Sequence, residues 1–152
     1  MMRITTAQRQ QPQMSGFSLI EVLIVVAIVG ILASVAYPGF SEQTRKSKRT
    51  DAKETLMRLA VAQEKYFIQK GSYTTDISSG LKNSSTESSE NNYTLTAKAG
   101  PTGSIATSFA VTATAKSGTS QAKDKDCISF TINSRNQRSA KTSSGSANTD
   151  CW

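Results

Sequence analysis

The 152-residue chain contains no histidine. Without an imidazole it cannot form a Ser-His or Cys-His catalytic pair, nor a metal site that depends on a histidine ligand. Its serines and carboxylates form no recognisable set of acid, base and nucleophile along the sequence. We therefore expect neither an enzyme nor a protein with a resident metal or cofactor.

Cysteine is rare, and apolar residues are scarce beyond the N-terminal part of the chain. The hydrophobic share is 37% and is concentrated in the first 40 residues, so the remainder can bury only a small core. The two cysteines, Cys127 and Cys151, could form a disulfide, and closing that loop would stabilise the fold by about 3.5 kcal/mol. The alternative is a pair of free thiols in a reducing compartment.

Positive charge exceeds negative charge, with 18 Lys and Arg residues against 11 Asp and Glu. This balance suits an anionic partner such as nucleic acid or a lipid surface. The densest cluster is Arg45, Lys46, Lys48 and Arg49, which could contact phosphates, anionic headgroups or acids on a neighbouring chain. The alternative is that the cluster is simply the solvated face of a helix.

A long apolar run is present at residues 17–37, and its one charged side chain is Glu21. As a helix the run spans roughly 30 Å, which matches the hydrocarbon core of a bilayer. A carboxylate inside that core costs about 2.5 to 3.5 kcal/mol. The run can therefore cross a membrane, but its acid needs a compensating charge.

Cleavage between Gly16 and Phe17 would supply that charge, because it creates an α-ammonium one helical turn from Glu21. The two charges could pair within one chain or between neighbouring chains staggered along an axis, so we expect Glu21 to set the register of a helical assembly. A conventional secretory signal is cut after its apolar region. Here the small residue, Gly16, stands before it, so the apolar segment would stay in the mature protein.

A second helical pattern follows the apolar run. Apolar residues recur at steps of three and four between Ala52 and Phe67, and Gly71 is a plausible C-terminal stop. Together the two patterns predict one helix over residues 17–69. Pro38 should kink it or melt one turn, and Gly30 is either a close-packing position or a neutral one facing lipid.

The C-terminal half has the pattern of a small sheet. Residues 72–92 are rich in Ser, Thr, Asn and Gly and predict a loop, while residues 92–99, 108–115 and 127–133 alternate apolar with polar side chains and predict antiparallel strands. We expect an α+β protein organised as a leader (1–16), a transmembrane and assembly helix (17–40) and a globular domain (41–152).

The segment "GFSLIEVLIVVAIVGILASVAYP" resembles the class III signal and N-terminal helix of type IV pilins and type II secretion pseudopilins. The resemblance implies cleavage after Gly16 by a prepilin peptidase that also N-methylates Phe17, followed by transfer from the inner membrane into a filament. It also matches Gly30 and Pro38 to positions where the family's helix melts on assembly. The implied fold is a long helix packed on a small antiparallel sheet, with a C-terminal loop closed by a Cys127–Cys151 disulfide.

The segments "RTDAKETLMRLAVAQEKYF", "GSYTTD", "DKDCISFTIN" and "DCW" resemble the minor pilin E family of type IVa pili, which helps to prime filament assembly. The implied partners are major and minor pilins, the prepilin peptidase and the inner-membrane assembly platform, and the pilus-level roles are adhesion, twitching motility and DNA uptake. Two alternatives are a DNA-binding pilin of a transformation apparatus and a type II secretion pseudopilin.

Topology raises a conflict. Basic residues after the apolar run outnumber Arg3 and Arg9 before it, which favours a cytoplasmic C-terminal part. The resemblance implies the opposite, a periplasmic domain before assembly and an extracellular filament afterwards. Because long domains translocate largely regardless of flanking charge, we expect an exported domain.

Overall fold

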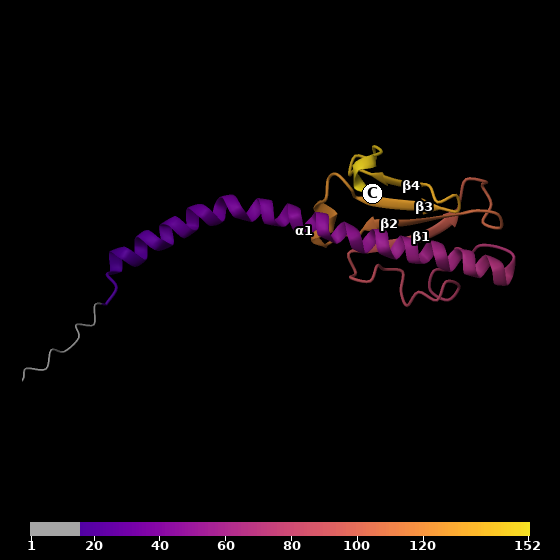
Figure 1. Cartoon of the computed structure of the whole chain (residues 1–152), viewed down its shortest axis with the longest axis horizontal. Helices are drawn as coiled ribbons and strands as arrows, with labels where there is room; N and C mark the ends of the chain where they lie inside the picture. The colour runs from indigo at the N-terminus through magenta and orange to yellow at the C-terminus, as the bar shows by residue number, and fades with distance from the viewer. Residues whose placement is uncertain (1–15) are drawn as a thin grey trace, which may run out of the picture. The chain divides into compact units, whose positions relative to one another are not determined.

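The computed structural model describes residues 16–152, with side chains for all of these except Tyr37 and Pro38. Most of the expected leader therefore lies outside the described residues. The chain divides into two compact units, one ending at Gly39 and the other running from Phe40 to Trp152. The elements are α1 (Leu19–Lys70), β1 (Tyr93–Ala99), β2 (Phe109–Ala115), η1 (Ser120–Lys123), β3 (Ser129–Asn133), β4 (Arg138–Lys141) and η2 (Thr149–Cys151) (Figure 1).

The helix α1 is continuous from Leu19 to Lys70. It ends at Gly71 as expected, because this glycine has a φ of +73° and its N–H donates to the carbonyl of Phe67 at 2.8 Å. Gly30 and Pro38 both lie within the continuous helix, so the locally melted turn considered at Pro38 is not present in this structure. A break at these two positions on assembly stays a prediction.

The second unit is built around a four-stranded antiparallel sheet in the order β1-β2-β3-β4. Its first three strands are those that the alternating pattern predicts. Phe130 is paired with Ala113 on β2 and with Ala140 on β4, so the inward-facing residues stay in register across the strands. The fourth strand was not predicted from the sequence, and the turn before it places Asn136 at a φ of +56°.

The core of this unit lies between α1 and one face of the sheet (Figure 1). Leu56 and Leu59 of α1 are almost fully buried in a cluster with Tyr93, Phe109 and Phe130 from the strands. This periodic burial confirms the amphipathic helix. The type IV pilin fold implied by the resemblance, a long helix packed on a small antiparallel sheet, is therefore confirmed.

Polar side chains of α1 hold the long loop between α1 and β1. The fully buried amide of Gln63 donates from Nε2 to the carbonyl of Thr74 at 2.6 Å and accepts from the backbone N–H of the same residue at 3.1 Å. Near the end of the loop, the buried carboxylate of Asp51 accepts from Ser88 Oγ at 2.6 Å and from Asn92 Nδ2 at 3.2 Å. The loop is thus fixed to the helix at both of its ends.

Candidate functional site

The first candidate site is the start of α1, where the sequence predicts cleavage and charge pairing. Gly16 and Phe17 precede the helix, and the carbonyl of Ser18 accepts from the backbone N–H groups of Glu21 at 3.1 Å and Val22 at 3.3 Å. Phe17 is 84% exposed, and together with Glu21 it lines a shallow apolar hollow. Glu21 lies in the first helical turn, where the helix dipole also favours a negative charge.

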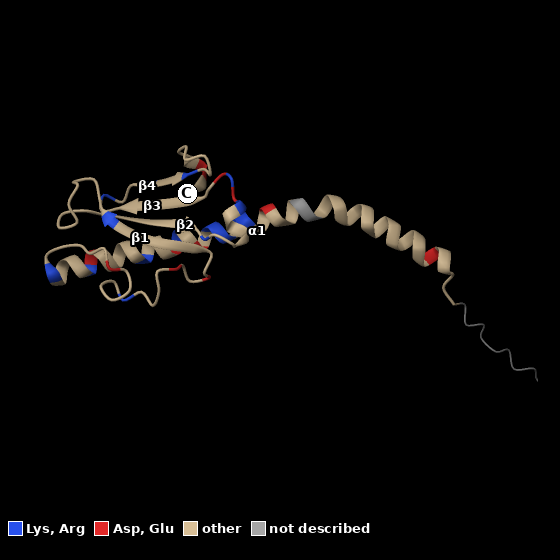
Figure 2. Ribbon diagram, turned by 180° about the vertical axis from the view of Figure 1, so that it is seen from behind, with Lys and Arg blue, Asp and Glu red and all other residues tan. Residues whose placement is uncertain are grey.

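The apolar helical surface beyond Glu21 is not covered by any other part of the chain that the structure describes. Every large apolar side chain described between Phe17 and Phe40 is more than half exposed, from 52% at Val22 to 84% at Phe17. Figure 2 shows the same stretch almost free of charged residues. The most apolar window of α1 has a mean hydropathy of 2.8, so α1 is long and apolar enough to cross a membrane. Surface of this kind is stable only against lipid or other apolar helices.

The second candidate site is the basic cluster of Arg45, Lys46, Lys48 and Arg49. These side chains differ in whether they have a partner within the chain. Arg45 forms an ion pair with Glu42 on its own helix. Lys48 donates to the hydroxyl of Ser120 at 3.1 Å. Lys46 is exposed and has no polar partner among residues 16–152.

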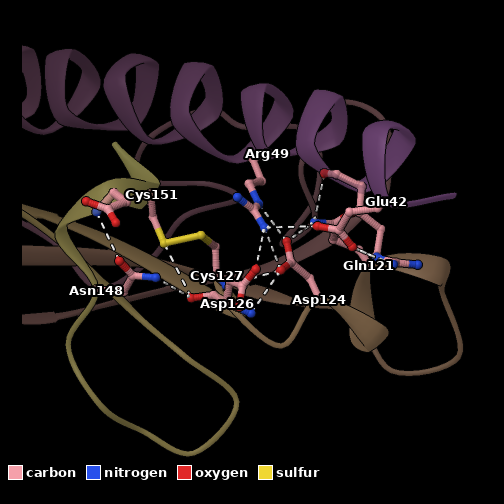
Figure 3. Close-up of polar contacts among 10 residues, drawn as sticks. Glu42, Arg49, Gln121, Asp124, Asp126, Cys127, Asn148 and Cys151 are labelled. Atoms are coloured by element: carbon pink, nitrogen blue, oxygen red, sulfur yellow. Dashed lines mark hydrogen bonds and ion pairs between the residues drawn. A yellow bond between two sulfur atoms is a disulfide. The ribbon is translucent and has the colours of Figure 1, made fainter. Parts of the chain in front are cut away.

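Arg49, the last member of the cluster, is a structural residue (Figure 3). Its Nε and Nη2 atoms donate to the two carboxylate oxygens of Asp124 at 2.7 and 2.8 Å, a bidentate pair. The Asp124 side chain is only 1% exposed and that of Arg49 only 11% exposed. The hydrogen bond to Asp124 raises the pKa of Arg49 above its ordinary value, against the opposing effect of burial.

Asp124 also organises the chain around the disulfide. Its Oδ1 accepts from the backbone N–H groups of Asp126 at 3.2 Å and Cys127 at 3.1 Å, and its Oδ2 accepts from Gln121 Nε2 at 3.0 Å. Gln121 in turn donates to the carbonyl of Arg45 at 3.3 Å. One buried carboxylate therefore links α1, the η1 turn and the start of the disulfide loop.

The cysteines form the disulfide Cys127–Cys151, with the two Cα atoms 5.8 Å apart. Beside it, Trp152 packs edge-on against Phe130 and donates from Nε1 to the carbonyl of Ser139 at 2.8 Å. The guanidinium of Arg138 lies 5.4 Å from the Trp152 ring centroid. The chain end is therefore packed on the sheet.

Two family models match the sequence over adjoining stretches. A model described as the prokaryotic N-terminal methylation motif matches residues 12–37, which include the predicted cleavage site. A model described as "Type IV minor pilin ComP, DNA uptake sequence receptor" matches residues 38–131, which is more than half of the chain. The chain belongs to the type IV pilin family. The match to the N-terminal methylation motif over residues 12–37 agrees with the class III signal in this pilin.

Curated relatives agree with this assignment. The pilin is 46% identical over 65 residues to the type IV major pilin protein PilA of Myxococcus xanthus, covering 43% of this chain and 30% of that protein. It is 38% identical over 71 residues to the type IV major pilin protein PilE of Neisseria gonorrhoeae, covering 46% of this chain and 42% of that protein. It is also 38% identical over 64 residues to the type II secretion system core protein G of Pseudomonas aeruginosa, covering 42% of this chain and 45% of that protein.

The pilin spans less than half the length of each of these relatives. The relatives are pilins and a secretion-system protein. An apolar N-terminal helix fits both membrane anchoring and a place in a pilus filament.

Sequence reasoning missed the part that Asp124 plays. The partner of Asp124 is Arg49, which lies 75 residues earlier in the chain. No periodicity or motif links two residues at that separation, so only the fold brings them together.

Proposed function

We propose that this chain is a minor subunit of a type IV pilus that helps to prime or build the filament. One observation carries the filament role: an acid, Glu21, stands near the start of the apolar part of α1, where every large apolar side chain described up to Phe40 is more than half exposed. Such a helix fits lipid before assembly and neighbouring helices after it. The Phe17 ammonium is the counter-ion that the acid requires in either setting. The description of the matched family model supports the minor role.

The proposal includes a maturation pathway. The leader is removed between Gly16 and Phe17, the new N-terminus is methylated, and the domain is held on the periplasmic side of the inner membrane until the assembly platform extracts it. In the filament, Glu21 of one chain pairs with the Phe17 nitrogen of its neighbour, and the helix opens near Gly30 and Pro38. Adhesion, twitching motility and DNA uptake then belong to the pilus as a whole.

Mass spectrometry of the native protein, combined with quantitation in purified filaments, tests this pathway. We expect a mature chain that begins with methylated Phe17 and is present at a few per cent or less of total pilin. A different N-terminus would refute the cleavage site. An abundance equal to that of the major pilin would refute the minor role, and absence from sheared filaments would favour the secretion-system alternative.

A second candidate function is DNA binding, which the description of the matched family model favours. Two observations support it here: the positive net charge of the chain, and the exposure of Lys46, which has no polar partner among the residues that the structure describes. Arg45 and Arg49 are poor candidates because both are held in ion pairs within the chain. We therefore narrow the proposed phosphate contacts in the cluster to Lys46 and Lys48.

Binding of DNA fragments by the full mature chain in nonionic detergent, measured over a range of salt concentrations, tests this candidate. Each phosphate contact contributes about −0.9 to the slope of log affinity against log salt. The change Lys46→Gln should therefore reduce the slope by about one, whereas Lys98→Gln, at an exposed position on β1, serves as the matched control. Binding that does not respond to salt would refute phosphate recognition.

A further inference from the structure

A groove in the second unit lies between α1 and the loop joining α1 to β1. Its main hollow has a volume of about 660 Å³. A second hollow of about 370 Å³ shares Arg58, Ala62, Leu81 and Lys82 with the first, so the two are continuous. Sites for small ligands typically fall between roughly 300 and 1,000 Å³.

The groove is lined by three cations, namely Arg58, Lys65 and Lys82. Arg58 donates from Nη2 to Ser89 Oγ at 2.9 Å, which orients the guanidinium without neutralising its charge. Within residues 16–152, neither lysine has an ion pair, and Lys82 is exposed on the loop side opposite the helix. The three charges are therefore available to a ligand.

Negative charge in the groove is already compensated. Glu87 is the one carboxylate among the described residues that line the two hollows, and it forms an ion pair with Lys116. The next hollow along α1 differs, because Asp51, Glu54 and Glu90 line it. The cations of the groove around Arg58 would thus attract an acidic ligand, whereas the carboxylates of the next hollow would repel it.

The remaining lining suits a sugar ring. The loop wall offers amide and hydroxyl groups from Asn83, Ser84, Ser85 and Asn91, which can donate to and accept from ligand hydroxyls. The floor contains Leu81 and Ala62, and the half-buried Tyr66 lines the second hollow. Apolar and aromatic surface of this kind packs against the C–H face of a ring, while the cations fix a carboxylate.

From this combination we propose that the groove binds an acidic saccharide, with a carboxylated sugar unit held by Arg58 and Lys82. Size and shape favour a saccharide over duplex DNA. Duplex DNA is recognised by protein elements that project into its grooves, whereas these cations line a hollow whose volume is in the range typical of small-ligand sites. The site is separate from the apolar assembly helix and from the basic cluster.

Calorimetric titration of the full mature chain in nonionic detergent tests the proposal. The probes are trigalacturonic acid, its uncharged methyl ester and an oligothymidylate of equal charge. The variants are Arg58→Gln and Lys82→Gln, and Lys98→Gln on β1 is the matched control because Lys98 is exposed but does not line the groove. Both groove residues are exposed, so neither change removes core packing.

We expect trigalacturonic acid to bind, the methyl ester to bind at least about tenfold more weakly, and each groove variant to lose about tenfold in affinity while Lys98→Gln loses none. Equal binding of acid and ester would overturn the charge argument, and unchanged affinity in both groove variants would overturn the location. Tighter binding of the oligothymidylate than of trigalacturonic acid would overturn the saccharide assignment and indicate single-stranded nucleic acid as the ligand. No binding of trigalacturonic acid at millimolar concentration would overturn the site altogether.

Discussion

Reducing the Cys127–Cys151 disulfide should destabilise the second unit strongly. The two cysteines are separated by 24 positions, and closing a loop of that length in the unfolded chain corresponds to about 3.5 kcal/mol. The unit from Phe40 to Trp152 has 152 − 39 = 113 residues, so its unfolding entropy is about 0.24 kcal/mol/K. Dividing the first value by the second predicts a fall in Tm of about 15 °C.

Thermal unfolding of the full mature chain, followed by circular dichroism with and without reductant, measures this shift. The double variant Cys127→Ala and Cys151→Ala is the control, because its Tm should be low and should not respond to reductant. A reductant-induced fall of less than about 3 °C in the native protein would refute the reasoning. It would mean that Trp152 and the hydrogen bonds beside it hold the chain end without the covalent link.

Four further predictions concern the assembly helix and the buried polar groups. The change Gly16→Val should block processing, leaving a precursor heavier by the leader mass on immunoblots; a mature-sized band would contradict the cleavage site. Glu21→Val should leave the protein inserted and processed but scarce in sheared filaments, and normal recovery there would contradict charge pairing. Arg49→Met should lower the free energy of unfolding in urea by about 3 to 5 kcal/mol, because it leaves the buried Asp124 carboxylate without its cation. Adding Asp124→Asn to this variant should recover part of the lost stability. If the effects of the two changes on the free energy of unfolding simply add, the result would argue against the pair. Burial raises the pKa of Tyr93, so above about pH 10 the unfolded phenol ionises first and stability falls by up to about 1.4 kcal/mol per pH unit. In Tyr93→Phe this alkaline loss should shrink, and an unchanged alkaline profile would refute the assignment.

The long helix and three strands could be predicted because each has a strong local signal. Leu56, Leu59 and Gln63 lie at the helical spacing that the core requires, and all three are buried. The alternation in β1 to β3 likewise matches their buried and exposed faces. Phe67 is an exception, because it follows the same helical spacing but is 36% exposed near the end of α1, where the helix is passing beyond the sheet.

The fourth strand and the groove could not be predicted in this way. In the four residues of β4 only Ala140 is buried, so the sequence shows no alternation of apolar and polar side chains there. The strand forms because it pairs with β3 after the turn at Asn136. The groove depends on how the loop after α1 is held by Asp51 and Gln63. Composition identifies that loop as a connection but not as the wall of a site.

The packing of the chain end against β4 has a consequence for contacts between molecules. The tail occupies the free margin of the sheet, where the carbonyl of Ala140 accepts from the N–H of Asn148 at 3.0 Å and Lys141 is bridged to Ala147. A margin of unpaired backbone groups recruits strands from other molecules. The disulfide holds this tail in place, so it also keeps the β4 edge covered and unavailable for pairing with a strand of another molecule.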